Sequence, residues 1–261
     1  MCTLIVLHRC VPGSPVVVAA NRDEFLERPA EPPSVRESGS GQFVAPRDCR
    51  AGGTWLGVNA AGLLVGLTNR PNAHPDPSRR SRGQVVVEAL GAQSADEAAC
   101  AALEIPSGAY NPFNLLLADR ERAFAVVYDE RPRVRELGPG AHVIGNAEPD
   151  AREVPKIGRL LACAENAAAQ PADQVLRALA ALCRGHEGGA SPREDACIHA
   201  GSYGTRSSAL VRLGADGTDG EFWFADGPPC VAPYQDFSPL LLKLDRGVGQ
   251  RAGDAWARTT S

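Results

Sequence analysis

The chain has 261 residues, of which 44% are hydrophobic and 22% are charged. These values favour a single layered α/β or all-β domain and exclude disordered, collagen-like and coiled-coil proteins. The formal net charge of −4 excludes the basic footprint of a nucleic-acid-binding protein. No window approaches the roughly 18 uninterrupted apolar residues of a membrane span, and no secretory signal is evident. We therefore expect a cytoplasmic protein without a transmembrane segment.

Eight cysteines are dispersed along the chain, and no two of them are separated by two residues. This spacing excludes zinc ribbons and CxxC redox centres, and we expect reduced, partly buried thiols. Cys197 and His199 are a close Cys/His pair, which alone is weak evidence for a metal, and the five histidines show no paired ligand spacing. We therefore predict no metal site. Seven thiols are interpreted as packing residues, and Cys2 is the exception.

Apolar, β-branched runs separated by turn residues predict two β-hairpins in the first part of the chain. The expected strands are 3–7 with 15–20, and 54–58 with 63–68. A polar, proline-rich stretch, 27–41, lies between the hairpins. Ser94 and Glu97 form a capping-box pattern that predicts a short helix reaching Leu103, and another helix is expected near 84–90.

The second part of the chain returns to strands, then helices, then strands. Four strand-like segments come first, at 113–118, 123–128, 133–137 and 142–144. Apolar residues at helical spacing then predict two helices on either side of Pro171, around 157–164 and 175–182. A loop is expected from residue 185 to 193. A strand pair is expected at 207–213 and 221–224.

Runs of strands that alternate with runs of helices predict α+β layering, with helices packed on antiparallel sheets. No internal repeat or linker marks a second domain, so residues 1–245 are predicted to form one domain followed by a loosely ordered tail, 246–261. The GxxxxGK[ST] pattern is absent from the sequence. Nucleotide chemistry is therefore disfavoured.

Cys2 carries the functional hypothesis. A small residue at position 2 favours removal of the initiator methionine, which would leave Cys2 with a free α-amine beside its thiol. An α-amino group has a reference pKa of about 7.7 to 8.0 and can accept the thiol proton without a histidine. The alternative is that Cys2 is a small apolar residue at the start of an edge strand.

Polar residues at predicted strand ends could complete such a site. Asp23 could orient the amine or be a turn residue; its neighbour Arg22 points to the opposite face of a regular strand, so both reach the cysteine only if the strand bends. Asn69 and Asn146 could each donate to an oxyanion or end a strand in an Asx-turn. Arg206 could hold a thiolate or an acyl carboxylate, or form a surface salt bridge.

Seven segments in order over residues 1–215 together resemble a known family. They are MC at the start, ANRDEF at 20–25, GGTWLGVN at 52–59, LTNRP at 67–71, SRG at 81–83, YNPFNLLLAD at 110–119 and YGTRSS at 203–208. The combination resembles the NRDE family, whose eukaryotic members are named for transport and Golgi organisation. That family resembles, in turn, the N-terminal nucleophile hydrolases of the choloylglycine hydrolase and penicillin acylase branch.

The resemblance implies a four-layer αββα sandwich. It also implies that Cys2 is nucleophile and base, that Asp23 orients the amine, and that the site is completed by three further residues. Asn69 and Asn146 would line the oxyanion and substrate side, and Arg206 would close the site. Supporting or substrate-binding positions would be Arg22, Trp55, Arg70 and Tyr203. Ala20 stands where the branch places an arginine, which leaves open whether Arg22 replaces it.

Two functional hypotheses follow. The first is a cysteine hydrolase that cleaves a non-peptide amide or a thioester through an acyl-enzyme at Cys2. The second is a non-catalytic carrier or chaperone for haem or acylated ligands such as acyl-CoA, on the same fold, because the family is associated with haem mobilisation and lipid homeostasis. Neither requires a cofactor, and haem enters only as a ligand. The expected partners are small molecules, and the oligomeric state does not follow from the sequence.

Overall fold

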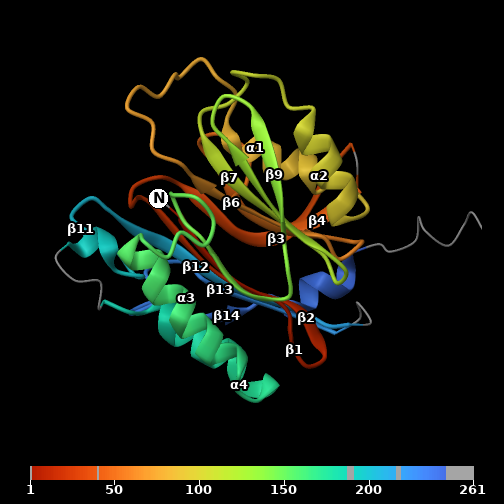
Figure 1. The fold of residues 1–261 in the computed structure, drawn as a ribbon, viewed down its shortest axis with the longest axis vertical. Helices are drawn as coiled ribbons and strands as arrows, with labels where there is room; N and C mark the ends of the chain where they lie inside the picture. The colour runs from red at the N-terminus through yellow and green to blue at the C-terminus, as the bar shows by residue number, and fades with distance from the viewer. Residues whose placement is uncertain (1, 40, 187–190, 216–218, 245–261) are drawn as a thin grey trace, which may run out of the picture.

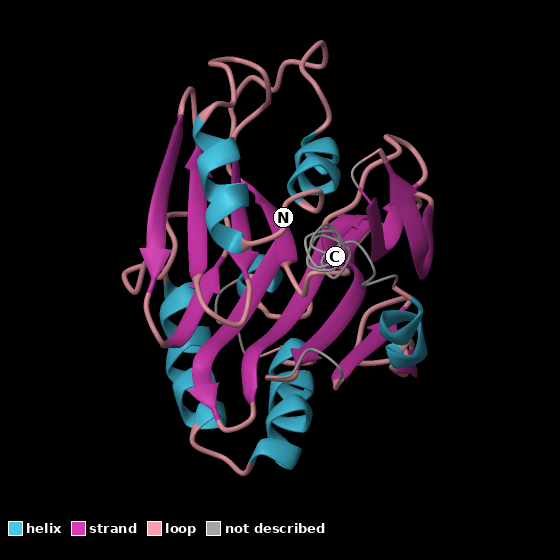
Figure 2. Ribbon diagram, turned by 90° about the vertical axis from the view of Figure 1, so that its right-hand side faces the viewer, coloured by secondary structure: helices cyan, strands magenta, loops and turns pink. Residues whose placement is uncertain are grey.

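The fold is described by a computed structural model over residues 2–39, 41–186, 191–215 and 219–244. Two antiparallel sheets pack face to face, and each is covered on its outer side by a pair of helices (Figure 1). A quarter turn shows the same arrangement of strands between helices (Figure 2). This is the predicted four-layer αββα sandwich. The predicted loose tail, 246–261, lies outside the described residues.

The first sheet contains the first and the last strand of the described chain. In spatial order its strands are β10 (Gly140–Ile144), β1 (Cys2–Val11), β2 (Ser14–Phe25), β12 (Tyr203–Leu213), β13 (Gly220–Ala225) and β14 (Gln235–Asp236), and β11 (His199–Ala200) pairs with β12. Both faces of β1 and β2 are covered, which explains why their sequences read as continuous apolar runs instead of alternating ones.

The second sheet is a meander with one long excursion between β6 and β7. Its strands are β3 (Ala30–Ser38), β4 (Gly41–Asp48), β5 (Leu56–Asn59), β6 (Leu64–Asn69), β7 (Phe113–Ala118), β8 (Ala123–Tyr128) and β9 (Pro132–Leu137). The excursion contains α1 (Arg82–Ala89) and α2 (Ala95–Leu103). The Ser94 side chain accepts a hydrogen bond from the backbone N–H of Glu97, as the capping pattern predicts.

Three apolar cores separate the four layers. Leu4 and Val6 belong to the core between the sheets, whereas Ile5 and Leu7 of the same strand pack against the helices α3 (Pro155–Ala168) and α4 (Ala172–Cys183). The third core lies between the second sheet and the pair α1 and α2. Two short 3₁₀ helices, Pro192–Glu194 and Ser238–Lys243, complete the described chain.

The predicted hairpins, helices and strands are present, but the polar stretch 27–41 contains a strand that its prolines concealed. Pro32 and Pro33 lie in β3, which is an edge strand, and the register with β4 shifts between Glu31 and Ser34. Proline has no N–H to donate, and an edge strand with a bulge tolerates that loss.

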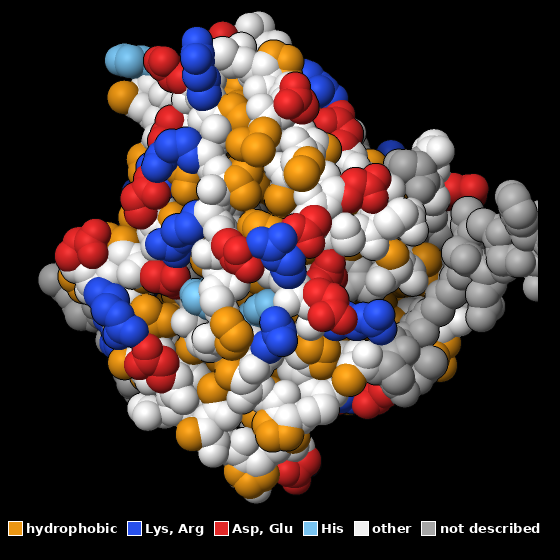
Figure 3. All heavy atoms as spheres, turned by 45° about the vertical axis from the view of Figure 1, so that its right-hand side comes forward, with side chains coloured by type: hydrophobic (Ala, Val, Ile, Leu, Met, Phe, Trp, Pro, Cys, Tyr) orange, Lys and Arg blue, Asp and Glu red, His pale blue; other side chains and the backbone are white. Residues whose placement is uncertain are grey.

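The surface agrees with the charge of the sequence. On the face shown in Figure 3, basic and acidic side chains are interspersed and do not gather into one basic patch. No helix within the described residues is long and apolar enough to cross a membrane.

Candidate active site

The start of β1 brings Cys2 and Arg22 together. The two residues are direct partners in the antiparallel pair of β1 and β2, so their side chains lie on the same face. Leu4 and Val6 continue that face into the core between the sheets. The thiol and the guanidinium therefore both face the second sheet, where Cys2 is 6% exposed and Arg22 is 4% exposed.

Arg22 is held by two contacts from the second sheet. Its guanidinium carbon lies 4.1 Å from the centre of the Trp55 ring, a cation–π geometry. Its Nη2 donates to Asp48 Oδ2 at 3.1 Å. Its Nη1 is buried and has no hydrogen-bond partner among the described residues. One N–H group of a firmly placed arginine therefore remains for a ligand near Cys2.

Asp23 points to the other face of β2, as strand alternation requires. Thr205 of β12 donates its hydroxyl to Asp23 Oδ1 at 2.7 Å, and the Tyr203 hydroxyl donates to the Asp23 carbonyl oxygen at 3.0 Å. The register between β2 and β12 shifts between Thr205 and Ser207, which places Thr205 directly opposite Asp23. Because Cys2 is paired with Arg22, Asp23 lies one step beyond, at the amino end of Cys2.

Charged groups on both faces of β2 change the pKa of the Cys2 thiol. Burial raises the pKa of the Cys2 thiol, and the Asp23 carboxylate raises it further. Arg22 and a hydrogen bond from the Asp23 backbone oppose this rise in the thiol pKa. Ionising the Cys2 thiol therefore requires a local base, which is the role that the hypothesis gives to its α-amine.

Lys156 is a site residue that sequence reasoning missed. Burial raises the pKa of Asp23 to about 6, against the ammonium of Lys156 and the Thr205 hydrogen bond, which lower it. Burial also lowers the pKa of Lys156, against the attraction of Asp23 and Cys2. The sequence signal that could have pointed to Lys156 is the rarity of lysine. Lysine occurs only at Lys156 and Lys243, and the other strongly basic residues are arginines.

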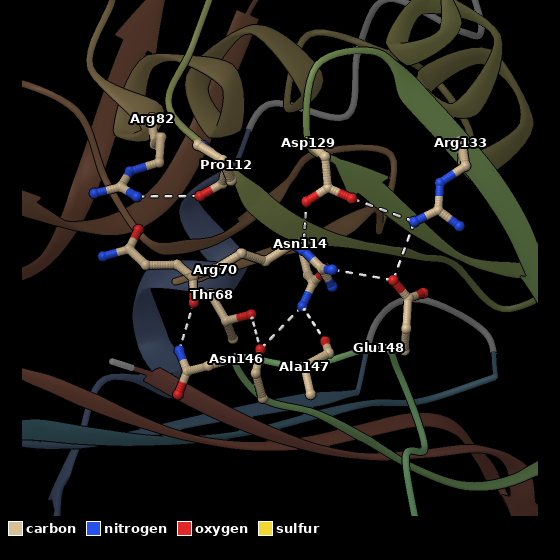
Figure 4. Close-up of polar contacts among 12 residues, drawn as sticks. Thr68, Arg70, Arg82, Pro112, Asn114, Asp129, Arg133, Asn146, Ala147 and Glu148 are labelled. Atoms are coloured by element: carbon tan, nitrogen blue, oxygen red, sulfur yellow. Dashed lines mark hydrogen bonds and ion pairs between the residues drawn. The ribbon is translucent and has the colours of Figure 1, made fainter. Parts of the chain in front are cut away.

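Asn69 at the end of β6 and Asn146 just after β10 contact each other, and the oxyanion role that the resemblance implies for both stays a prediction. Asn146 Nδ2 donates to the backbone carbonyl of Asn69 at 2.5 Å, so the two strand ends from different sheets are tied to each other (Figure 4). Asn69 also lines the cleft that contains Cys2. Asn146 therefore positions Asn69 through its side chain.

The neighbouring network fixes this connection. Thr68 Oγ1 donates to the Gly145 carbonyl at 2.5 Å, and Asn114 Nδ2 donates to the same oxygen at 3.0 Å. Figure 4 shows Asn114 between the strand end at Thr68 and the segment that contains Asn146. Both Thr68 and Asn114 are fully buried. This network therefore fixes the backbone at the end of β6 against the segment that contains Gly145 and Asn146.

Two of the predicted arginines are engaged elsewhere. Arg70 forms ion pairs with Asp129 at 2.9 Å and Glu148 at 3.1 Å (Figure 4). Arg206 Nη1 pairs with Asp226 at 2.6 Å. Neither arginine is among the residues that line the cleft around Cys2. The structure thus gives Arg70 and Arg206 acidic partners, and their roles toward a substrate stay predictions.

The cleft around Cys2 has a volume of about 460 Å³ and is rich in arginine. The arginines lining it are Arg22, Arg28, Arg50, Arg79, Arg80 and Arg82. The acidic residues lining it are Asp23, Glu24, Asp48 and Asp76. Six basic and four acidic groups leave two formal positive charges, which suits an anionic ligand.

Arg82, at the start of α1, is a second residue that sequence reasoning missed. It makes no ion pair among the described residues and donates from Nη1 to the Pro112 carbonyl at 3.1 Å (Figure 4). Burial lowers its pKa, whereas the attraction of Cys2 and Glu24 raises it. A half-buried guanidinium without an acidic partner in a cleft favours an anion.

Comparison of the sequence with known families identifies the family of this chain. The family model described as "Transport and Golgi organisation 2" matches residues 1–223. The chain belongs to the Transport and Golgi organisation 2 family. Its relatives include the Transport and Golgi organization protein 2 homolog of Bos taurus, which is 29% identical over 235 residues covering 77% of this chain and 83% of the relative. The Homo sapiens homolog is 28% identical over 230 residues, with the same coverage of both chains.

Solved structures place this Transport and Golgi organisation 2 chain in a known fold. A mutant conjugated bile acid hydrolase from Clostridium perfringens matches with a TM-score of 0.57 and 11% identity, over 92% of this chain and 93% of that chain. The N-acylethanolamine-hydrolyzing acid amidase ortholog of Caenorhabditis elegans matches with a TM-score of 0.53 and 12% identity, over 80% and 91%. At these identities the likeness shows the N-terminal nucleophile hydrolase fold and no activity.

Proposed function

We propose that this protein is a cysteine hydrolase that cleaves a non-peptide amide or a thioester bond in a small anionic molecule. The observation that carries the proposal is the meeting of three parts at the start of β1. Cys2 begins the strand, Asp23 lies at its amino end, and a cleft lined by six arginines opens beside the thiol. The structural neighbours are named as hydrolases of N-acylethanolamine and of conjugated bile acid, which supports the same reaction class.

The reaction begins with a proton transfer. With Met1 removed, the unprotonated α-amine of Cys2 takes the proton of its own thiol, and the ionised Asp23 carboxylate orients the resulting ammonium. The thiolate then attacks the substrate carbonyl carbon and forms a carbon–sulfur bond. The negative charge moves to the carbonyl oxygen, and the Asn69 amide in the cleft can donate a hydrogen bond to it.

Collapse of this intermediate completes the first half of the reaction. The carbon–nitrogen or carbon–sulfur bond to the leaving group breaks, and the α-ammonium returns its proton to that group. Water then attacks the acyl-enzyme with the α-amine as base and releases the acid and the free Cys2 thiol. The arginines of the cleft hold the anionic part of the substrate while the bond is broken.

The carrier hypothesis has less support in the site. None of the described residues that line the cleft is a histidine, so a haem bound there would depend on Cys2 as its axial ligand. A haem titration with wild-type and Cys2→Ser protein distinguishes this case, because a carrier loses its Soret shift in the variant.

Labelling kinetics test the hydrolase proposal. Cys2 is buried, whereas Cys49 and Cys100 are exposed, so an ordinary thiol at position 2 would react with iodoacetamide more slowly than the exposed pair. We expect intact mass to show loss of Met1, and Cys2 to be alkylated at least about 10-fold faster than either exposed thiol at pH 7 to 8. An acyl thioester bearing a carboxylate should add one acyl mass at Cys2.

Matched variants complete this test. Cys2→Ser should remove the fast phase and the acyl adduct, whereas Cys100→Ser should keep both. Retention of Met1, or labelling of Cys2 more slowly than Cys49 and Cys100, would overturn the proposal.

A further inference from the structure

A second cluster of reactive side chains lies outside the Cys2 cleft. It consists of His186, Cys197, His199 and Cys230, and one ligand atom from each lies within 4.8 Å of all the others. The four residues come from three separate segments: the chain after α4, the start of β11, and the loop after β13. We name these four side chains the Cys/His cluster.

The distances in the Cys/His cluster match a tetrahedral metal site. Cys197 Sγ lies 3.6 Å from Cys230 Sγ and 3.7 Å from His199 Nε2, and His199 Nε2 lies 3.2 Å from Cys230 Sγ. Tetrahedral zinc with metal–sulfur bonds of about 2.3 Å and metal–nitrogen bonds of about 2.0–2.1 Å separates its ligand atoms by roughly 3.3 to 3.8 Å. The ligand atoms of Cys197, His199 and Cys230 are therefore already spaced close to the separations that zinc requires, and a ligand atom of His186 lies within 4.8 Å of each of them.

The fourth ligand, His186, is oriented by the backbone carbonyl of Cys197. The Nδ1 of His186 lies 3.0 Å from the Cys197 carbonyl oxygen, so this nitrogen donates and leaves the lone pair on Nε2. Zinc-binding histidines commonly donate their second ring nitrogen to a carbonyl in this way. The rings of His186 and His199 lie 5.1 Å apart at 40°, which lets both imidazoles approach one ion.

We propose that the Cys/His cluster binds one Zn²⁺ as a structural site. Two thiolates and two imidazoles in tetrahedral arrangement are a ligand set for zinc. Four protein ligands leave no open position for water or substrate, which distinguishes a structural site from a catalytic one. Binding converts both thiols to thiolates and releases their two protons to solvent.

The site would stabilise the segment that holds Asp23. Ile198 lies between two of the ligands, and its backbone N–H donates to Thr205 Oγ1 at 2.8 Å. The same hydroxyl donates to Asp23 Oδ1 at 2.7 Å. A zinc ion bound by Cys197 and His199 would therefore fix the donor behind the Asp23 carboxylate, without contact with Cys2 or a substrate.

A disulfide is the competing interpretation of the two sulfur atoms. A disulfide bond is about 2.05 Å long, whereas Cys197 Sγ and Cys230 Sγ are 3.6 Å apart and both thiols are free. A disulfide would also leave the convergence of His186 and His199 without a role. The geometry therefore favours a shared ion.

Metal analysis of the full chain tests the site. Protein freed of any histidine tag and dialysed against metal-free buffer should retain about one zinc per chain by inductively coupled plasma mass spectrometry. Replacement by Co²⁺ should give the intense visible bands of tetrahedral cobalt together with thiolate-to-cobalt charge transfer. A thiol-blocking mercurial should release the zinc in proportion to the two thiolates modified.

Matched variants locate the ion. Cys230→Ser and His199→Asn should each reduce the zinc retained after dialysis at least about 10-fold. Cys100→Ser and His74→Asn, which alter exposed residues outside the cluster, should retain the wild-type amount. Circular dichroism identifies any variant that fails to fold, and the cobalt spectrum of the wild type keeps the test decisive in that case.

Three results would overturn the zinc proposal. These are less than about a tenth of a zinc per chain after reconstitution, a cobalt spectrum without thiolate bands, or a Cys197–Cys230 disulfide in freshly purified protein. None of them would affect the proposed hydrolase, because that function is tested by the labelling of Cys2.

Discussion

The two sheets differ in how completely they satisfy their buried polar groups. Among the described residues, buried side-chain atoms without a hydrogen-bond partner include Asn21 Oδ1, Arg22 Nη1 and Ser207 Oγ. These three atoms belong to β2 or β12 near Cys2, His8 Nδ1 lies toward the other end of β1, and none of the atoms found belongs to the second sheet. Each unsatisfied buried group costs about 1–3 kcal/mol. The buried polar atoms without partners therefore lower the stability of the first sheet near the proposed substrate site.

The second sheet has the opposite character. Phe113 stacks on Tyr128 with ring centres 5.0 Å apart, and Tyr110 meets both rings edge to face. The Tyr128 hydroxyl donates to the Pro106 carbonyl at 2.7 Å and accepts from the backbone N–H of Ala109 at 3.0 Å. This aromatic cluster is fully packed and its polar atoms are paired. Packing in this part of the second sheet is thus complete, whereas the buried polar atoms without partners lie in the first sheet, which holds the proposed reaction site.

Truncation of the aromatic cluster should have the largest effect on stability. Phe113 is fully buried, so Phe113→Ala should lower the free energy of unfolding by about 3–5 kcal/mol, measured by urea denaturation. Leu103→Ala, at a residue that is 53% exposed, should change it by less than about 0.5 kcal/mol. The folded fraction of Phe113→Ala should still label Cys2 at the wild-type rate. A selective loss of Cys2 labelling in folded Phe113→Ala would contradict the idea that packing of the second sheet and the proposed site in the first sheet are independent.

Substitution of Asp23 should act on stability in a pH-dependent way. Its pKa is raised by burial from 3.8 to about 6, so the folded state binds more protons than the unfolded state between these values. The stability from this group is therefore full below pH 3.8 and is lost as the pH rises through about 6. The change corresponds to about 3 kcal/mol.

The measurement compares urea unfolding of wild type and Asp23→Asn at several pH values. The stability of wild type relative to the variant should fall by about 2.4 kcal/mol from about pH 4 to about pH 8. The fast labelling of Cys2 should be lost in the variant because its α-amine loses its acceptor. Asp173→Asn, at an exposed residue of α4, should track wild type at every pH. Parallel curves for wild type and Asp23→Asn would contradict the burial of an ionisable Asp23.

Much of the fold could be predicted because its central strands are continuous apolar runs bounded by turn residues. The predicted segments 113–118 and 123–128 coincide with β7 and β8, since each is a continuous apolar run between turns. The strand β3 was missed because Pro32 and Pro33 read as a break when edge position is unknown. Local patterns reveal periodicity, but they do not reveal which strand lies at an edge.

The site was less predictable because its parts meet only through the tertiary fold. Lys156 acts on Asp23 from α3, more than a hundred residues along the chain. Cys230 joins Cys197 only after β12 and β13 pair, so the ligand spacing in sequence resembles no zinc motif. The resemblance supplied Cys2, Asp23 and the Asn residues, but charge pairs such as that of Arg206 with Asp226 carry no sequence signature.

The smallest predicted effect concerns whether Arg22 can serve where related hydrolases place an arginine at the position of Ala20. Residues 20 and 22 of one strand share a face, and they are separated by about 7 Å along it. Ala20 lies in the core between the sheets, so a guanidinium there would be buried among apolar side chains. Arg22 delivers its guanidinium to the same side at the strand end, where Trp55 and Asp48 hold it.

Arg22→Lys tests this idea because it keeps the positive charge and removes the planar guanidinium group. We expect a loss of about 1 kcal/mol in the free energy of unfolding, from weaker stacking on Trp55 and a lost hydrogen bond. An anionic thioester should acylate Cys2 more slowly in the variant, whereas a neutral thioester should react at the wild-type rate. Arg36→Lys, in the edge strand β3, is the matched control and should leave both rates unchanged. Equal slowing of both thioesters would mean that Arg22 places the Cys2 thiol and does not bind the substrate anion, because a lost anion contact can slow only the charged ester.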